Sequence, residues 1–276
     1  MTDTISAPGE AFVAEWEQWH RDLDAQRSAP HGFLAYTGFH LLDAEPRRFD
    51  GLPGAWSSGP DGPAVELDAG EQLQVADRPV AGRHGFGPLV ERQFLLAASF
   101  GDARAELSRR GGRDIVRALH PDHGTRTAFR GTPTYAPDPA WAIPATFEPA
   151  EREIELAAYL PAITHRHDSP GRVRFEHAGA EHTLTLIRAG APSADGADIA
   201  IALFRDATSG VTTYQAGRSL LLTLPVGTSD LTLDFNRARN LQCAYIEFAP
   251  CPLAPAENQL PFAVDAGERT PWEKLG

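Results

Sequence analysis

The sequence is almost free of lysine. Lys274 is the single lysine, and every other member of the 25 Lys and Arg residues is arginine. P-loop, protein-kinase and serine β-lactamase signatures and pyridoxal-phosphate sites all need a lysine at a set place. One lysine at position 274 meets none of these requirements, so these classes are excluded. The arginine bias itself is typical of a GC-rich bacterial coding sequence.

Cysteine and long apolar runs are scarce as well. Cys243 and Cys251 are the only cysteines, too few for a disulfide framework and without the C-x-x-C spacing of zinc ribbons. We therefore expect both to be reduced thiols. No 18-residue apolar run and no signal-peptide pattern occurs. The sequence predicts a cytoplasmic protein without a membrane partner.

The sequence has fewer basic than acidic residues, 25 against 37, and its net charge is −12. Such a chain repels phosphate backbones, so no nucleic-acid partner is expected. The sequence also lacks a G-x-S-x-G elbow and an H-E-x-x-H helix. Its nearest match to a dinucleotide fingerprint, Gly85-Phe86-Gly87, has no third glycine, and we predict no cofactor.

One segment has a helical period. Phe12, Trp16, Trp19 and Leu23 recur every three or four residues between prolines 8 and 30. This spacing predicts an amphipathic helix whose tryptophans pack on the core. The alternative is a helix that offers its tryptophans to a partner.

From residue 31 onward, short alternating runs are broken by Gly, Pro and Asp every 8 to 12 residues, the spacing expected of sandwiches or barrels. Residues 103–107 with 114–119, and 172–176 with 183–187, are predicted hairpins around glycine turns. Further strands are expected at 199–204, 219–224 and 231–235. Their connections are too short for crossover helices, which favours antiparallel pairing. The predicted fold is mainly β, an antiparallel barrel or sandwich with one N-terminal amphipathic helix.

Prolines mark the expected domain organisation. Three prolines in residues 133–139 exclude a central strand and indicate a subdomain boundary. We therefore predict an N-terminal helix in residues 1–29, a β subdomain in 30–128 and a β-barrel-like domain in 129–276. Within the last, the proline-rich stretch 251–261 is expected to wrap the surface as extended chain.

Histidines occur in two groups that resemble metal sites. His165 and His167 would share one face of a strand, and His177 or His182 could supply a third ligand. Solvent-facing histidines explain this spacing equally well, so we predict no metal there. Residues 120–123 place two histidines and an aspartate in a turn, which we interpret as a solvated loop.

The densest polar cluster lies at predicted strand ends within residues 204–218 and 233–240. Arginine forks bind carboxylate or phosphate, and asparagine and tyrosine orient a ligand. The candidate ligand-binding residues are Arg205, Asp206, Tyr214, Arg218, Asp234, Asn236 and Arg237. Alternatively, the arginines pair with Asp206 and Asp234 in a purely structural network.

At these residues the chain resembles DUF1684, a bacterial and archaeal family of unknown function. The resemblance is carried by Phe204 to Gly210, Thr213-Tyr214, Gly217-Arg218, Leu233 to Arg237, Asn240, Cys243, Cys251-Pro252-Leu253, Glu257-Asn258 and Leu260-Pro261, together with His31 to Leu34, Thr37-Gly38, His40 to Leu42 and Phe129 to Pro133. It implies a compact, mainly β fold of soluble cytoplasmic proteins, and it brings no established activity.

Two functions from different classes follow as hypotheses. In the first, a barrel pocket near residues 234–237 accepts a small anionic molecule, and an enzyme of this kind would be a hydrolase using Asp206, Asp234, Tyr214 or a histidine as acid or base. In the second, the chain is a non-catalytic interaction or structural module. The sequence decides neither between them nor the catalytic residues nor the oligomeric state.

Overall fold

The computed structural model describes residues 8–160, 163–190, 196–224 and 226–274. The chain divides into two compact units. The first unit contains Met1–Asp24, Gly131–Tyr245 and Pro250–Gly276, and the second contains Ala25–Arg130 and Ile246–Ala249. The predicted domains also include residues that lie outside the described ones, namely 1–7, 161–162, 191–195, 225 and 275–276. The sequence-based division at 29/30 and 128/129 stays a prediction.

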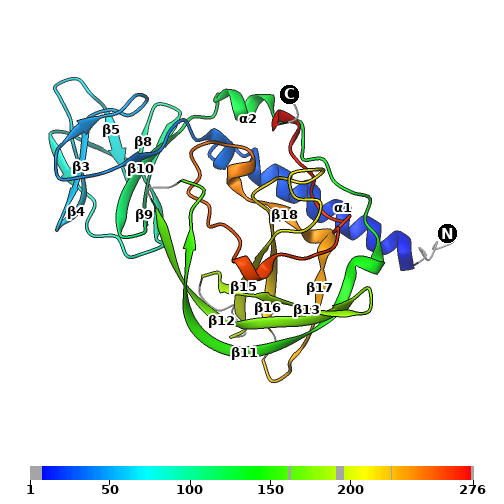
Figure 1. Ribbon diagram of the computed structural model, residues 1–276. Helices are drawn as coiled ribbons and strands as arrows, with labels where there is room; N and C mark the ends of the chain where they lie inside the picture. The colour runs from blue at the N-terminus through cyan, green and yellow to red at the C-terminus, as the bar shows by residue number, and fades with distance from the viewer. Residues whose placement is uncertain (1–7, 161–162, 191–195, 225, 275–276) are drawn as a thin grey trace. The chain divides into compact units, whose positions relative to one another are not determined.

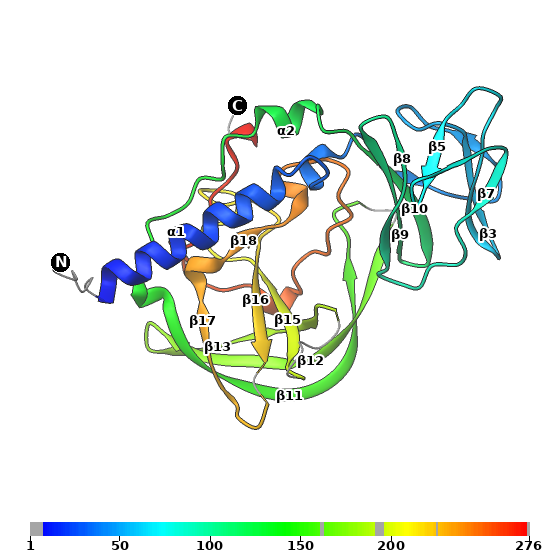
Figure 2. The same cartoon turned by 180° about the vertical axis from the view of Figure 1, so that it is seen from behind.

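Helix α1 (Pro8–Arg27) forms where the helical period predicted it. Trp16 is 6% exposed and Leu23 is buried, while Trp19 is half-buried. Figure 2 shows α1 as the long helix at the N-terminal end of the chain. The Trp16 indole donates a 2.7 Å hydrogen bond to the carbonyl of Asn236 in the first unit. The prediction that the tryptophan face packs on the core is confirmed for Trp16.

The first unit is built from two four-stranded antiparallel sheets. One has the order β13-β12-β11-β17, with β11 (Ala142–Ala157), β12 (Thr164–His177), β13 (Ala180–Thr185) and β17 (Asp230–Asp234). The other has the order β14-β15-β16-β18, with β14 (Ile187–Arg188), β15 (Asp198–Phe204), β16 (Arg218–Leu224) and β18 (Arg239–Asn240). The predicted hairpin at 172–187 and the strands near 199–204, 219–224 and 231–235 are all observed.

Strands β11 and β12 are long and strongly curved (Figure 1). Their pairing register shifts between Pro149 and Arg152, and a bulge of this kind bends a strand pair. Opposite it, Gly171 has φ +147°, and a Cβ there would lie 2.2 Å from the carbonyl oxygen of Glu148. Only glycine permits the close approach of the two backbones at this bend.

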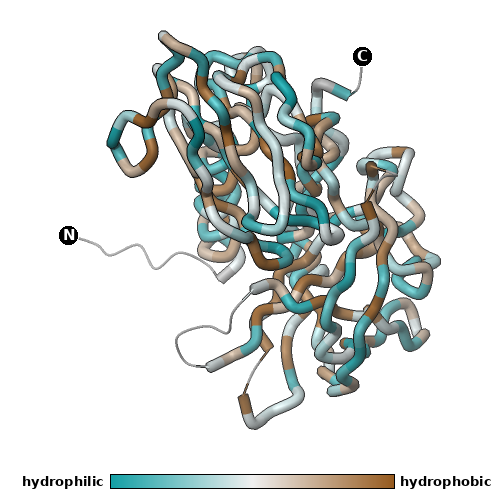
Figure 3. Tube along the Cα trace, turned by 90° about the vertical axis from the view of Figure 1, so that its left-hand side faces the viewer, coloured by the Kyte–Doolittle hydropathy of each residue, from teal (hydrophilic) through white to brown (hydrophobic). Residues whose placement is uncertain are grey.

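The two sheets of the first unit enclose one hydrophobic core. Hydrophobic and hydrophilic residues follow one another at short intervals along the chain (Figure 3). The inward side chains from both sheets include Val173, Leu184, Phe204, Leu220 and Leu233. The sequence predicts an antiparallel barrel or sandwich. Among the described residues each of the two sheets ends in strands that pair on one side only, so a closed barrel is not observed. The physical reason is that β14 and β18, at the ends of their sheet, are only two residues long and form no ladder with the other sheet.

The second unit contains a six-stranded and a four-stranded antiparallel sheet, ordered β1-β10-β9-β8-β5-β6 and β2-β3-β4-β7. The strands are β1 (His40–Leu41), β2 (Arg47–Arg48), β3 (Ala55–Gly59), β4 (Gly62–Glu66), β5 (Leu73–Val75), β6 (Arg78–Val80), β7 (Arg83–Gly85), β8 (Phe94–Phe100), β9 (Ala103–Arg110) and β10 (Arg113–Leu119). The predicted hairpin at 103–119 is β9 and β10, joined by two glycines with positive φ. Residues 120–123 form the predicted turn before helix α2 (Gly124–Ala128).

Among the described residues, no helix has the length and apolar character to cross a membrane.

Glu71, in the second unit, should make the free energy of unfolding fall as the pH is lowered. Hydrogen bonds from Arg48 and from the backbone amides of Gly54 and Asp68 lower the Glu71 pKa from 4.5 to about 2. A carboxyl group with a lowered folded-state pKa stabilises the fold above its unfolded pKa and loses that contribution as the pH falls through the folded pKa. We therefore expect Glu71→Gln to destabilise the protein at pH 7 and to have little effect near pH 2. Urea unfolding across this range measures it, and a pH-independent difference would contradict the assignment.

Candidate functional site

Arg218 and Asp206, two of the predicted site residues, form a buried ion pair in the first unit. The distance between Arg218 Nη2 and Asp206 Oδ2 is 2.9 Å, and both side chains are at most 1% exposed. The guanidinium also donates to the backbone carbonyls of Val264, Ala266 and Glu268. Burial lowers the Arg218 pKa, while the neighbouring Asp206 carboxylate opposes that shift. This side chain therefore joins β16 to the C-terminal segment.

Asp206 organises the loop after β15. Its Oδ1 accepts from the backbone amide of Thr208 at 2.7 Å and from that of Val264 at 3.3 Å. Arg205, one residue earlier, is exposed and pairs through its backbone with residues 258–260. Asp206 therefore stabilises the fold through its carboxylate, and Arg205 through its backbone hydrogen bonds.

Tyr214 is buried, and its hydroxyl donates a 2.9 Å hydrogen bond to the carbonyl of Cys243. Burial and a hydrogen bond with Tyr159 raise the Tyr214 pKa, so the phenol stays protonated. Cys243 and Cys251 are buried thiols rather than a disulfide, as expected, and the Cys243 backbone amide donates to Cys251 Sγ at 3.3 Å. A hydrogen bond with Cys251 and burial raise the pKa of the Cys243 thiol.

The remaining predicted residues form a second group at the end of β17. Asp234 Oδ1 accepts from the Asn236 backbone amide at 3.1 Å and from its side-chain amide at 2.9 Å. Asn236, fully buried, also exchanges two 2.9 Å hydrogen bonds with the backbone of Asp138. Arg237 pairs with Asp234 at 3.2 Å and with Glu15 of α1 at 2.5 Å, and its guanidinium lies 5.4 Å from the Trp19 ring centre. This group fastens helix α1 to the strand end.

The structure thus gives the seven predicted residues different partners. Arg218 pairs with Asp206, and Asp234 binds Asn236 and Arg237. Tyr214 and Arg205 bond to other parts of the chain. Three hollows on the first unit, of about 420, 630 and 430 Å³, are lined by other residues, mainly of β11 and β12. The largest borders the opposite end of β17 from Asp234, near Asp230 and Arg174. Convergence of the predicted residues on a ligand stays a prediction.

The predicted histidine pair does share a strand face. His165 and His167 are buried with ring centres 5.6 Å apart, and His165 Nε2 lies 2.5 Å from the carbonyl oxygen of Pro250. His177 and His182, considered as third ligands, pack on Phe262 with ring centres 4.3 and 4.8 Å away.

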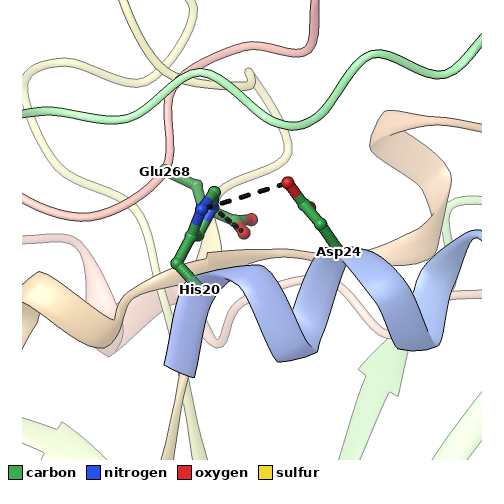
Figure 4. A group of neighbouring side chains, drawn as sticks. All are labelled: His20, Asp24 and Glu268. Carbon is green, nitrogen blue, oxygen red and sulfur yellow. Dashed lines mark ion pairs between the residues drawn. The ribbon is translucent and has the colours of Figure 1, made fainter. Parts of the chain in front are cut away.

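His20, Asp24 and Glu268 form a group that the sequence interpretation missed (Figure 4). His20 Nδ1 lies 3.9 Å from Asp24 Oδ2, and His20 Nε2 lies 3.5 Å from Glu268 Oε1. The first two lie one turn apart on α1, on the face that packs inward, and this spacing is a signal in the sequence. Glu268 comes from the irregular C-terminal segment, where no periodicity marks it.

Comparisons with known proteins support a family but no activity. Residues 127–269, just over half of the chain, match the family model described as a protein of unknown function, DUF1684. An uncharacterized protein of Haloarcula marismortui, with a solution NMR structure, is 32% identical; the match covers 54% of this chain and 80% of that one, with a TM-score of 0.43. No curated protein matches.

The fold and the two groups define a mainly β protein whose C-terminal segment and N-terminal helix are held by arginine, aspartate and asparagine side chains. The chain belongs to the DUF1684 family, and the predicted membership is confirmed.

The Arg218–Asp206 pair supports a stability prediction. Arg218→Gln would leave the Asp206 carboxylate buried without its cation, which costs about 3–5 kcal/mol. Asp206→Asn should cost a similar amount, and the double variant should cost less than the sum of the two. Arg205→Gln, at an exposed neighbouring position, should change stability by less than about 0.5 kcal/mol. Denaturant unfolding measures all four variants, and a loss below about 1 kcal/mol for Arg218→Gln would show that the pair is not structural.

Proposed function

We propose that the protein is a non-catalytic binding or interaction module in which the arginine, aspartate and asparagine residues of the family motifs form the scaffold. The observation that carries the proposal is the guanidinium of Arg218, which is 1% exposed and donates to Asp206 and three backbone carbonyls. A buried fork engaged by protein acceptors is not available to the carboxylate or phosphate of a ligand.

The contacts of the acid–base candidates give the hydrolase hypothesis less support. Asp206 and Tyr214 are buried and hydrogen-bonded within the protein. Because burial raises the Tyr214 pKa, this phenol is a poor base at neutral pH. General acid–base catalysis needs a group within reach of substrate, and these two side chains are occupied by internal partners.

A small anionic ligand is the second candidate, and Arg237 favours it. Its side chain is 36% exposed, and its partner Glu15 is 74% exposed. An exposed ion pair contributes little and exchanges partners readily. A small anion could therefore compete with Glu15 for the Arg237 guanidinium beside the Trp19 ring.

The proposed setting is the cytoplasm. The two cysteines are unlinked although they lie close together, which suits a reducing compartment.

Titration of the full chain with inorganic phosphate, sulfate and citrate separates the two candidates. A scaffold predicts no saturable rise in melting temperature with any anion, and a change of less than about 1 kcal/mol in stability for Arg237→Gln. A saturable rise that Arg237→Gln abolishes would replace the scaffold proposal by anion binding. Arg166→Gln, which removes another exposed arginine paired with glutamates, is the matched control and should retain any such rise.

A further inference from the structure

The side chains of His20, Asp24 and Glu268 form a set of metal-donor groups that is separate from the Arg218–Asp206 ion pair. One imidazole nitrogen and one oxygen from each carboxylate lie within 4.8 Å of one another. Imidazole and carboxylate together are ligands of Zn²⁺, Mn²⁺ and other first-row divalent ions. The three side chains point toward a common space between α1 and the C-terminal segment (Figure 4).

The donor atoms lie further apart than those of a hydrogen-bonded ion pair. The distances of 3.5 and 3.9 Å belong to different nitrogens of the His20 ring, Nε2 with Glu268 and Nδ1 with Asp24, whereas charge-assisted hydrogen bonds measure about 2.7–2.9 Å. An ion can bind only one of these nitrogens, and one nitrogen lies within 4.8 Å of an oxygen of each carboxylate. Two ligand atoms about 2.1 Å from one tetrahedral ion are about 3.4 Å apart, so a bound ion would draw these atoms closer together. His20 Nε2 is buried and makes no hydrogen bond within the described residues.

The charge of the group also favours a divalent ion. The Glu268 side chain is 1% exposed, and those of His20 and Asp24 are 14% and 18% exposed. Two carboxylates brought this close with little water repel each other. A protonated imidazole offsets one negative charge, while a divalent cation with a neutral imidazole offsets both.

Surrounding residues hold both carboxylates in place. Thr132 donates from its backbone amide to Asp24 Oδ2 at 3.0 Å and from its hydroxyl to Oδ1 at 3.1 Å. Glu268 Oε2 accepts from the backbone amide of Asn240 at 2.7 Å and from the Tyr245 hydroxyl at 3.3 Å. The other oxygen, Oε1, faces His20. Such outer contacts orient the ligands in metal sites.

A further contact fixes the imidazole. The Trp16 ring stacks on the His20 ring with centres 5.3 Å apart and planes 3° apart. Because Trp16 is buried and hydrogen-bonded to the backbone, its ring restricts the rotation of the histidine. The imidazole of His20 is therefore already oriented in the absence of an ion.

We propose that His20, Asp24 and Glu268 bind one divalent transition-metal ion, which clamps helix α1 to the C-terminal segment. Three protein ligands leave one position for water or for a small ligand. This site goes beyond the proposed function and does not depend on it, because it uses the side-chain carboxylate of Glu268, whereas Arg218 donates to the backbone carbonyl of that residue.

Metal binding to the chelator-treated full chain tests the proposal, with Zn²⁺ and Mn²⁺ as separate probes. We expect one equivalent of at least one ion by calorimetry and elemental analysis, and a rise in melting temperature with ion concentration. His20→Gln and Glu268→Gln should each weaken binding by more than about 100-fold, and Tyr245→Phe, which removes an outer contact, by about 10-fold. Asp24→Asn is a further ligand variant should Glu268→Gln fail to fold.

His120→Gln is the matched control, because it removes an exposed histidine beside another aspartate in the second unit. It should leave affinity and stoichiometry unchanged. Co²⁺ gives a second readout, since its visible absorption in the wild-type protein should be lost in His20→Gln while folding is retained. The proposal is overturned if neither probe ion binds stoichiometrically, if binding survives His20→Gln, or if it is lost in His120→Gln. The result of the anion titration does not affect metal binding, so the scaffold proposal and the metal-site proposal can each be contradicted without the other.

Discussion

The structure of the first unit depends on one buried cation. Arg218 sits at the start of β16 with its guanidinium in the protein interior, where an uncompensated charge would cost several kcal/mol. Asp206 supplies the opposite charge, and three carbonyls of the C-terminal segment accept hydrogen bonds from Nη1 and Nη2. The position of that segment is therefore dictated by the need to solvate the guanidinium.

The same principle holds the rest of the irregular chain. Asn258 is fully buried, and its side-chain amide bonds the backbones of Thr185 and Leu203, so a proline-rich stretch is fixed without a strand ladder. Gly267 has φ +74°, and a Cβ there would lie 2.5 Å from the carbonyl of Ala238. Side chains that bond to backbone replace regular secondary structure here, which explains how an extended segment can bury residues such as Glu268.

The sequence predicted those parts of the fold that have a local period. The alternation at 172–176 and the four apolar positions of the helix appear in the structure because a strand or helix face must be buried wherever it lies. A closed barrel, one of the two predicted forms, is not observed. Closure depends on which edge strands pair, and two-residue strands such as β14 have no alternating pattern that could be recognised in the sequence. Among the site residues, the importance of Arg218 could be recognised, but three of its acceptors are backbone carbonyls that carry no side-chain signal. Glu268 was missed because its neighbours in space, His20 and Asp24, are at the other end of the sequence.

Native-state hydrogen exchange gives the most direct measurement of whether the buried Arg218 makes the C-terminal segment part of the core. The amides of Leu260 and Glu268 donate to backbone carbonyls of Arg205 and Ala238, at 2.8 Å each, and serve as reporters. We expect them to exchange with the same free energy as amides of β15 and β16, through global unfolding of the first unit. Exchange of these two amides by local opening, while β15 and β16 stay protected, would contradict the account.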